Sequence, residues 1–195
     1  MKDYSQHGEQ ALILDYFGHA PNGRFLDIGA NDGVTFSNTY ALFLMGWRGA
    51  LVDASPNAYK ALEANFERFR NKPEIIHAAI TTQDGTVTLH ESSDTLVSSL
   101  SAEAQQTWRH HGFQWTPVQV PGMTVDTLYA VLGTNEFDFV SVDAEGHDLD
   151  IVRQLHLDTV KMLCVEYGQH KREIIKACPG FNMLLDNGVN VILAR

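Results

Sequence analysis

The sequence has few cysteines, no long apolar run and few basic residues, and each shortage excludes a class of protein. Two cysteines occur in 195 residues, Cys164 in an apolar run and Cys178 before a proline. They cannot build a disulfide framework or a four-thiolate zinc site. The longest apolar stretches, such as ALFLM and VILA, are far shorter than the roughly 20 residues that span a bilayer. The N-terminus MKDYSQHGEQ carries no signal-like apolar block, so we expect a cytoplasmic protein that does not bind membranes.

The shortage of positive charge argues against a nucleic-acid partner. The chain has 14 Lys and Arg against 24 Asp and Glu, a formal net charge of −10. Such a surface repels phosphate backbones unless a local basic patch intervenes, and the sequence offers none beyond KRE at 171–173. We therefore expect no nucleic acid among the partners.

Apolar segments alternate with helix-like segments along the chain. Five of the apolar segments read as strands buried on both faces, because their apolar residues are continuous; they are 24–30, 48–54, 74–80, 137–144 and 161–167. The clearest helix follows the second of them. Ser55 is its predicted N-cap and Pro56 its first residue, and apolar residues recur at helical spacing at Ala58, Leu62, Phe66 and Phe69.

This alternation predicts an α/β fold with a doubly wound, mostly parallel sheet and helices on both faces. A chain of 195 residues, 44% of them hydrophobic, is long enough for one buried core, so we expect one domain over 1–195. The irregular stretch within 86–122 is predicted to supply a hairpin and a lid over the site.

Four acidic residues follow the predicted strands, and they suggest where the site lies. Asp27, Asp53, Asp143 and Glu166 all stand at or near strand carboxyl ends. Parallel sheets of this kind bind ligands along that edge. We therefore expect the four carboxylates to converge on one crevice.

The first strand ends in DIGANDG, in which Gly29 and Gly33 permit a tight turn and close backbone approach to a ligand. The spacing differs from the dinucleotide fingerprint, and Asp27 would repel a pyrophosphate. S-adenosylmethionine fits better, because its ammonium suits Asp27 and its ribose hydroxyls need an acceptor such as Asp53. The alternative is that both acids only cap neighbouring loops.

Eight segments, taken in order, match one known family. They are YSQHGEQALI (4–13), GRFLDIGANDGVTFSNT (23–39), GALVDASP (49–56), AAITTQDGTVTL (78–89), SSL (98–100), VPGMTVDTL (120–128), DFVSVDAEGHDLDIV (138–152) and LCVEYG (163–168). Together they resemble the FkbM-type methyltransferases, which are mostly assigned to O-methylation. The resemblance covers nearly the whole chain and implies a Rossmann-like class I methyltransferase fold with S-adenosylmethionine as cofactor.

The resemblance also assigns roles to both ends of the chain. It implies that the N-terminal segment 1–20 covers the cofactor, with the family's common Glu-Asp pair appearing here as Glu9 and Gln10. The family usually ends in a two-stranded hairpin, but only one strand fits after Gly188, so we expect a shortened hairpin. The cofactor-binding residues predicted from the glycine turn, the strand ends and the resemblance are Gln6, Glu9, Asp27, Gly29, Ala30, Asn31, Gly33, Asp53, Ala54, Ser55, Ile80 and Asp143.

The segment SVDAEGHDLD (141–150) has three possible roles. In one, Glu145 or His147 is the base that removes a proton from an acceptor hydroxyl, and Asp143 orients the cofactor. In another, these three residues bind a divalent cation. In the third, His147 or Asp148 only begins a helix. We favour the first role and expect no metal, because three donors on one short loop make a thin cage for an ion.

Other residues are weaker candidates. Trp108, His110, His111, Phe113 and Trp115 would line an acceptor pocket or lie in an exposed lid helix, and His77 reads as a core histidine. Ser98 and Ser99 fall at a family position or in an ordinary turn, and Glu166 closes the acceptor side of the pocket or bonds to a loop.

The absence of two motifs reduces the number of possible methyl acceptors. No two prolines are adjacent, so the D/N-P-P-aromatic motif of amino-group methylation is missing, and CP at 178–179 reverses the Pro-Cys order of cytosine C5 methylation. A hydroxyl of a small molecule, sugar or glycan is the leading acceptor. The alternatives are a nucleotide-dependent oxidoreductase and a cofactor-binding module without catalysis. The sequence gives no oligomeric state.

Overall fold

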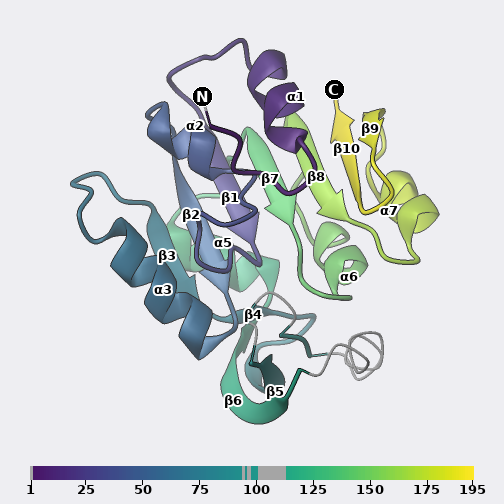
Figure 1. Ribbon diagram of the computed structural model, residues 1–195. Coiled ribbons are helices and arrows are strands. Elements are labelled where there is room, and N and C mark those ends of the chain that lie inside the picture. Colours follow the sequence, from purple (N-terminus) through teal and green to yellow (C-terminus); the bar gives the residue numbers. More distant parts are fainter. Residues whose placement is uncertain (1, 94, 96–97, 101–112) are drawn as a thin grey trace.

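The computed structural model describes residues 2–93, 95, 98–100 and 113–195, and its centre is a seven-stranded sheet (Figure 1). The strand order is β3-β2-β1-β7-β8-β10-β9, with every pairing parallel except those of β10. The strands of this sheet are β1 (Arg24–Ile28), β2 (Arg48–Asp53), β3 (Glu74–His77), β7 (Phe139–Val142), β8 (Met162–Glu166), β9 (Asn182–Asp186) and β10 (Asn190–Ala194). The predicted doubly wound α/β fold is confirmed.

Helices cover both faces of this sheet. One face carries α1 (Glu9–Tyr16), α2 (Tyr40–Leu44) and α3 (Pro56–Phe66), and the other carries α5 (Val125–Leu132), α6 (Asp148–Val152) and α7 (Lys171–Ala177). Successive residues of a strand point to opposite faces, and the core divides accordingly. In β1, Phe25 packs with α1, α2 and α3, whereas Leu26 packs with α5 and α6.

Helix α3 begins as the sequence predicts. The Ser55 hydroxyl accepts hydrogen bonds from the backbone N–H groups of Asn57 and Ala58, and Pro56 occupies the first turn. Ala58, Leu62 and Phe66 are buried. This helix therefore begins directly after the Asp53 strand end and fixes the loop between them.

The segment 74–80, predicted as one strand, is divided between two sheets. β3 (Glu74–His77) pairs with β2, but the backbone N–H of Ala78 donates to the Asp53 carbonyl, and β4 (Ala79–Ile80) pairs with β6 instead. A second sheet of order β4-β6-β5 results, built on the antiparallel pair β5 (Gly85–Ser92) and β6 (Trp115–Met123). β5 and β6 thus form an antiparallel pair in the region predicted to supply a hairpin, and it lies below the carboxyl ends of the main strands (Figure 1).

The expectation of a shortened C-terminal hairpin is wrong. A single strand does follow Gly188, but the first strand of the hairpin, β9, lies before it at Asn182–Asp186. β9 pairs with β10 from Asn182, opposite Ala194, to Asp186, opposite Val191, with a register shift between Ile192 and Leu193. Because Met183 and Leu184 in β9 are exposed, this edge strand lacks the continuous burial by which the other strands were recognised.

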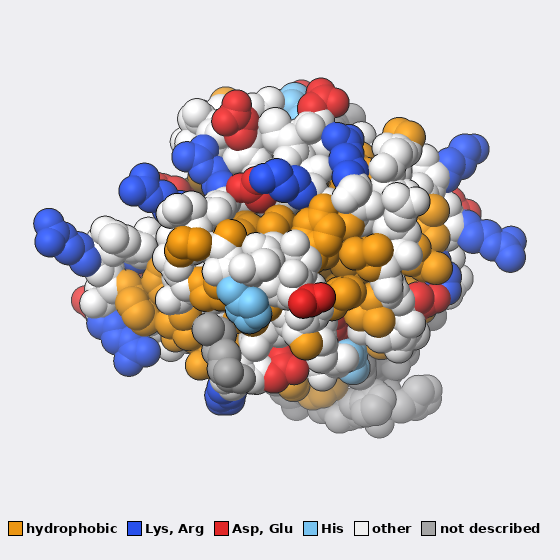
Figure 2. Space-filling model, turned by 90° about the horizontal axis from the view of Figure 1, so that it is seen from above, with side chains coloured by type: hydrophobic (Ala, Val, Ile, Leu, Met, Phe, Trp, Pro, Cys, Tyr) orange, Lys and Arg blue, Asp and Glu red, His pale blue; other side chains and the backbone are white. Residues whose placement is uncertain are grey.

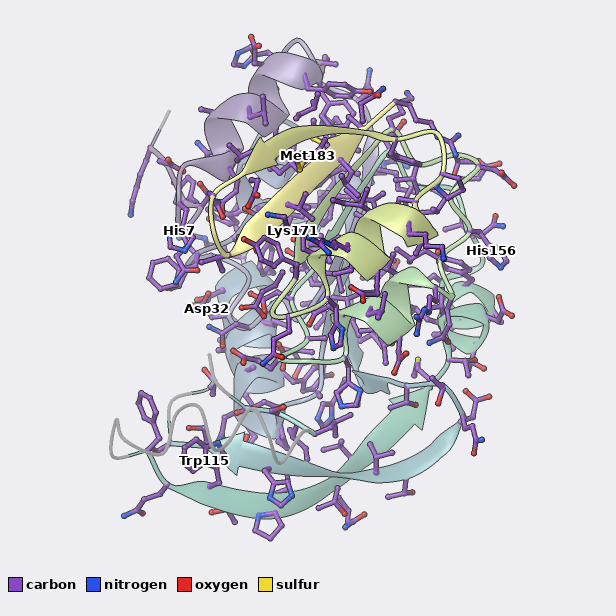
Figure 3. The ribbon with its side chains drawn as sticks, turned by 90° about the vertical axis from the view of Figure 1, so that its right-hand side faces the viewer. His7, Asp32, Trp115, His156, Lys171 and Met183 are labelled. Atoms are coloured by element: carbon purple, nitrogen blue, oxygen red, sulfur yellow. The ribbon has the colours of Figure 1, made fainter. Side chains whose placement is uncertain are left out.

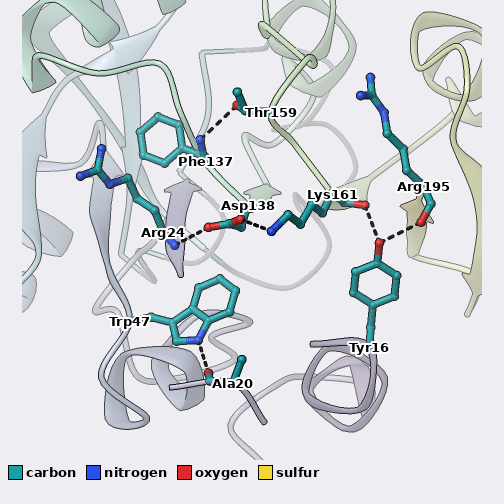
Figure 4. Close-up of polar contacts among 9 residues, drawn as sticks. All are labelled: Tyr16, Ala20, Arg24, Trp47, Phe137, Asp138, Thr159, Lys161 and Arg195. Atoms are coloured by element: carbon teal, nitrogen blue, oxygen red, sulfur yellow. Dashed lines mark hydrogen bonds and ion pairs between the residues drawn. The ribbon is translucent and has the colours of Figure 1, made fainter. Parts of the chain in front are cut away.

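The opposite end of the sheet, where the parallel strands begin, is closed by contacts between distant parts of the chain (Figure 4). The Tyr16 hydroxyl of α1 donates to the Arg195 carbonyl at 2.9 Å. Asp138 accepts from the Arg24 backbone at 2.9 Å and pairs with Lys161 at 2.8 Å. The N-terminal helix and the C-terminus are therefore both fixed to the beginning of the sheet.

Figure 2 looks down on this end, where Lys and Arg side chains stand around the rim. Arg24 and Arg48 begin β1 and β2, and Lys161 precedes β8. Asp27, Asp53 and Glu166, predicted for the site, lie toward the other ends of these three strands. Basic and acidic side chains thus stand together where the strands begin, whereas acidic side chains gather where they end. Of the described helices, none has the length and apolar character needed to cross a membrane.

Candidate active site

A pocket lies where the carboxyl ends of β1, β2 and β7 face the small sheet. It encloses about 670 Å³, including space open to solvent. One part of its wall is apolar, from Ala54, Ala79, Ile80, Leu89 and Leu100. The polar part contains these side chains: Asn31, Asp53, Ser55, Thr95, Ser98, Ser99, Asp143, Glu145 and His147.

The predicted site residues divide into two groups by their distance from this pocket. Those that line it are Gly29, Asn31, Asp53, Ala54, Ser55, Ile80, Asp143, Glu145 and His147. Those that lie outside its wall are Gln6, Glu9, Asp27, Ala30 and Gly33. The structure therefore brings together the predicted catalytic loop and the predicted ribose acceptor, but not the N-terminal candidates.

Gly29 lets the first turn pass close to the acidic loop. Its φ is +84°, and a Cβ built on it would lie 1.6 Å from the backbone oxygen of Asp143. The backbone N–H groups of Gly29 and Ala30 both donate to the Val52 carbonyl, at 2.9 and 3.1 Å. A side chain at this position would separate the two loops, so glycine is needed here for packing as well as for its backbone angle.

Gly33 serves packing of a different kind. Its φ is +73°, and an added Cβ would lie 2.6 Å from the Phe66 ring of α3. The residue is therefore required where the first turn packs on this helix, outside the pocket wall.

Asp53 stands at the end of β2 and organises the pocket wall on both sides. One oxygen accepts the backbone N–H of Asn31 at 2.8 Å and the other that of Ser55 at 2.8 Å. Burial raises the pKa of Asp53 to about 7 against the lowering effect of these bonds, and the charge of Asp27 adds to the rise. Each oxygen retains capacity for one more hydrogen bond, which two hydroxyl donors could fill.

Asp27 is buried beneath the pocket rather than in its wall. Its carboxylate accepts a 2.6 Å hydrogen bond from the Thr39 hydroxyl, and burial raises its pKa to about 6. Its charge acts on the carboxyl groups of both Asp53 and Asp143. Asp27 thus adds to the negative potential of the site without reaching the pocket.

Asp148 shapes the acidic loop. Its carboxylate accepts the backbone N–H groups of Ala144 at 2.7 Å and Gly146 at 3.1 Å. Glu145 and Gly146 have φ of 48° and 102°, so the loop turns sharply between them. His147 occupies the position before α6 but makes no capping bond with its side chain. Asp148 therefore fixes the loop before the helix, and Glu145 and His147 line the pocket wall.

Asp143 and Glu166 meet at the ends of the neighbouring strands β7 and β8. Carboxylate oxygens of Asp143, Asp148 and Glu166 lie within 4.8 Å of one another. Burial, then the charges of Glu166 and Asp148, raise the pKa of Asp143 well above its usual value. Burial and the charges of Glu145 and Asp148 raise the pKa of Glu166 to about 7.

Asp143 also reaches solvent through the pocket, and water there weakens the effect of burial on it, whereas repulsion by its neighbours remains. The cluster differs from the cation set considered as an alternative role of the acidic loop, because Glu145 and His147 are not part of it. Its oxygens could contact one cation, but Asp148 already accepts two backbone bonds. We assign no ion to it.

Glu9 connects the N-terminal segment to the C-terminal hairpin. It is fully buried, and its carboxylate accepts Nδ2 of Asn187 at 2.8 Å, Nδ2 of Asn190 at 2.7 Å and the backbone N–H of His7 at 2.8 Å. Burial alone would raise the pKa of Glu9, but these hydrogen bonds lower it. The residue is thus committed to structural partners.

The N-terminal segment lies on the loop that follows β1. Ser5 forms a parallel bridge with Phe36, and the Tyr4 ring packs edge-on against Tyr40 at 4.8 Å between centroids. In Figure 3, His7 of this segment lies on the same side of the molecule as Asp32 and Trp115. The segment therefore packs on the loop after β1 and on α2, and none of its described residues lines the pocket; that it covers the cofactor stays a prediction.

Several weaker candidates have local partners. Nε2 of His77 lies 3.1 Å from the Ala54 carbonyl, and the Ser99 hydroxyl donates to the Glu145 carbonyl at 2.7 Å. Phe113 and Trp115 contact each other edge-on at 6.3 Å. Trp108, His110 and His111 fall outside the described residues.

The sequence reading missed Glu91 and Asn38. Glu91 in β5 accepts the Ser55 hydroxyl at 2.6 Å, beside Asp53; only the fold of the small sheet reveals this. Asn38 donates from Nδ2 to Ser141 at 3.3 Å, while its Oδ1 is buried without a hydrogen-bond partner among the described residues. Its place in the matched segment SNT was the one signal that could have found it.

Comparison with known proteins agrees with this geometry. Solved structures of similar fold include monomeric WbdD (14% identity, TM-score 0.56, covering 99% of this chain and 41% of that chain). Others are the METTL16 MTase domain (12%, 0.55, 95% and 65%) and the O-methyltransferase from Bacillus cereus in complex with SAH (14%, 0.52, 99% and 83%). The chain thus spans less than half of the WbdD structure. A search of curated proteins found no match.

The sheet order, with a glycine turn and a pocket at the strand ends, is that of a Rossmann-like α/β fold, which the chain shares with these solved structures. The profile described as "Methyltransferase FkbM domain" matches residues 27–186, which is most of the chain. The chain therefore belongs to the FkbM methyltransferase family, as its motifs had indicated.

Proposed function

We propose that the protein transfers a methyl group from S-adenosylmethionine to a hydroxyl of a small molecule, sugar or glycan. The observation that carries this proposal is the joining of the Gly29 turn, the Asp53 strand end and the acidic loop 143–147 around one pocket. The missing proline-pair motif argues against amino-group methylation. A net charge of −10, and a described pocket wall without Lys or Arg, argue against nucleic acid as acceptor.

The described residues fit this cofactor part by part. The apolar wall near Ala79 and Leu89 suits an adenine ring, and Asp53 has one remaining acceptor site on each oxygen for the two ribose hydroxyls. The absence of a Cβ at Gly29 leaves room for close approach of the chain that follows the ribose. S-adenosylmethionine supplies an electrophilic methyl group on a positively charged sulfur.

The protein's own contribution is positioning and proton removal. Asp143 and the loop it begins hold the reacting groups in line, and Glu145 or His147 takes the proton of the acceptor hydroxyl as its oxygen attacks the methyl carbon. Both side chains line the pocket. Asp148 fixes the loop backbone through Ala144 and Gly146. The side chain of the base is therefore not needed to hold the loop in place.

The test compares turnover of S-adenosylmethionine, with a panel of hydroxyl acceptors, in the presence and absence of a chelator. If Glu145 or His147 is the base, turnover survives the chelator. Glu145→Gln or His147→Ala then lowers kcat by about 10²-fold or more while cofactor affinity stays the same. Asp150→Asn, at an exposed position of α6, is the matched control and should leave kcat unchanged.

Other outcomes would support other functions. Loss of turnover with chelator and its return with magnesium or manganese would make the loop a metal site. A stability change of about 1 kcal/mol in both variants with intact turnover would make them helix-start residues only. Calorimetric binding of NAD in place of S-adenosylmethionine would favour the oxidoreductase, and cofactor binding without turnover of any acceptor would favour a non-catalytic module.

A further inference from the structure

The carboxyl groups of Asp143 and Glu166 form a pair at the ends of adjacent parallel strands. Val142 and Val165, the residues before them, are register partners in β7 and β8. Oxygens of the two side chains lie within 4.8 Å of each other. Asp143 lines the pocket, and its backbone lies against Gly29, so the pair stands beside the first turn.

Other titratable groups around this pair come from four places in the fold. They are Asp27 of β1, Glu145 and His147 of the acidic loop, Asp148 of α6 and Asp53 of β2. Within the described part of the chain, no Lys or Arg forms an ion pair with Asp143, Asp148 or Glu166. The carboxyl groups of Asp143, Asp148 and Glu166 lie so close together that they cannot all ionise at low cost.

Burial and the neighbouring carboxylates raise the pKa of both members, that of Glu166 to about 7, with the effect of burial on Asp143 weakened by its access to solvent. Near pH 7 the pair therefore holds a proton in about half of the molecules or more. A fixed positive charge within about 4–6 Å would favour the fully ionised pair and displace that proton.

The methyl donor and its product differ by such a charge. S-adenosylmethionine has a sulfonium, whereas S-adenosylhomocysteine has a neutral thioether and is otherwise the same molecule. Resting on the proposed function, we propose that the Asp143 and Glu166 pair distinguishes the methyl donor from the demethylated product by giving up its shared proton to solvent when the sulfonium binds.

The proton balance closes over one cycle. Binding of the donor releases one proton from the pair. In methyl transfer the carbon–sulfur bond breaks, its electrons stay on sulfur and the positive charge disappears. The acceptor hydroxyl loses one proton in the same step, and the pair takes up one proton. The protonated pair then faces the neutral sulfur of the product, with no positive charge to attract it. The product is then bound less tightly than the donor, which favours its release.

The test measures proton release by calorimetry, with S-adenosylmethionine and S-adenosylhomocysteine titrated near pH 7 in buffers of different ionisation enthalpy. A chelator is present throughout. Both ligands would contact Asp53, so its titration contributes equally and cancels in the difference. We expect the donor to release about half a proton or more beyond the product, and the preference for the donor to rise about tenfold between pH 6 and pH 8.

Glu166→Gln should abolish both the difference in proton release and the pH dependence of the preference. Asp143→Asn provides a second variant if Glu166→Gln does not fold, and thermal melting checks both. Glu136→Gln, exposed at the opposite end of the sheet, is the matched control and should behave as the wild type.

Equal proton release for the two ligands, or a difference that persists in both variants, would overturn this inference while leaving the proposed cofactor intact. Failure of both ligands to bind would instead refute the proposed cofactor, and the inference with it.

Discussion

The Asp53 carboxylate does two things at once. It holds the backbone of Asn31, whose φ is 49°, and that of Ser55, each through one hydrogen bond of 2.8 Å. These bonds orient both oxygens along the pocket wall. A ribose bound there would donate to a carboxylate that the protein already holds in a fixed orientation. This reduces the entropy lost when the ligand binds.

Asp53→Ala should therefore weaken S-adenosylmethionine binding by about 2–3 kcal/mol, the range for hydrogen bonds to a charged group. Isothermal titration measures the affinity, and thermal melting separates this loss from any loosening of the Asn31 loop. Asp15→Ala on the exposed face of α1 is the control. An unchanged affinity would show that the ribose binds elsewhere.

Single residues were predicted well from the sequence where their partners are local. Ser55 caps α3 because its partners lie two and three residues away. The partner of Asp27 is Thr39, twelve residues later in a loop, and no pattern in the sequence announces that bond. Asp27 was predicted for the ligand ammonium; the structure gives it a buried hydroxyl partner, and its effect on a ligand remains a prediction.

At the level of elements, the turn after β1 depends on one glycine. Gly29→Ala should destabilise the protein by more than 3 kcal/mol and abolish cofactor binding, since the Asp143 backbone must move away from the new Cβ. Urea unfolding and calorimetry measure the two effects.

Gly133 is the matched control for this substitution. It also has positive φ, +66°, but nothing lies within 4 Å of an added Cβ, so Gly133→Ala should cost about 1 kcal/mol. Equal costs for the two variants would mean that backbone angle, and not contact with the acidic loop, makes glycine necessary at position 29.

The N-terminal segment depends similarly on Glu9. Glu9→Ala removes the acceptor of three donors, from His7, Asn187 and Asn190. Only Asn190 among these residues is buried, and an unsatisfied buried donor costs about 1–3 kcal/mol, whereas the other two donors can bond to water. We expect a loss of roughly 2–4 kcal/mol and faster proteolysis before residue 9, with cofactor affinity lowered less than by Asp53→Ala.

The exposed Glu67→Ala serves as the control for this variant. A large loss of affinity without a loss of stability would return Glu9 to the cofactor site, as the family resemblance implies.

Strands were predictable where their residues are continuously apolar and buried, and ambiguous where they are not. The strands β1, β2, β7 and β8 are buried on both faces and were recognised from their apolar runs. The division of 74–80 at Ala78 was not predictable, because the change of partner from β2 to β6 is decided by a strand some forty residues away. β9 was missed because it is largely exposed.

Over the whole molecule, the two ends of the strands differ in charge. Acidic groups gather at the carboxyl ends, where no described Lys or Arg lines the pocket. Arg24, Arg48 and Lys161 stand beside acidic residues where strands begin, at the end seen in Figure 2. A net charge of −10 adds general repulsion that salt screens. The methyl-donor cofactor, with its positively charged sulfonium, would reduce the repulsion among the acidic groups at the strand ends.

The acidic residues at the strand ends predict how the stability of the ligand-free protein depends on pH. The folded-state pKa values of Asp27, Asp53 and Glu166 are raised, to about 6, 7 and 7, so the folded state binds protons more tightly than the unfolded state. Their contribution is present below the unfolded pKa and is lost as pH rises through the folded values. Solvent access to Asp53 through the pocket moderates its share. The pKa of Glu9 is lowered, so its contribution is lost only at acid pH.

We therefore expect the melting temperature to be highest near pH 5 and to fall steadily toward pH 8, measured by calorimetry at constant ionic strength. Asp53→Asn should flatten part of that fall because it removes one of the titrating groups. Saturating S-adenosylmethionine should flatten it further, since a cation favours the ionised acids that repel one another in its absence. A melting temperature that rises between pH 5 and pH 7.5 would mean that these carboxyl groups are already ionised in the folded protein, and that the strand ends are far better solvated than their burial indicates.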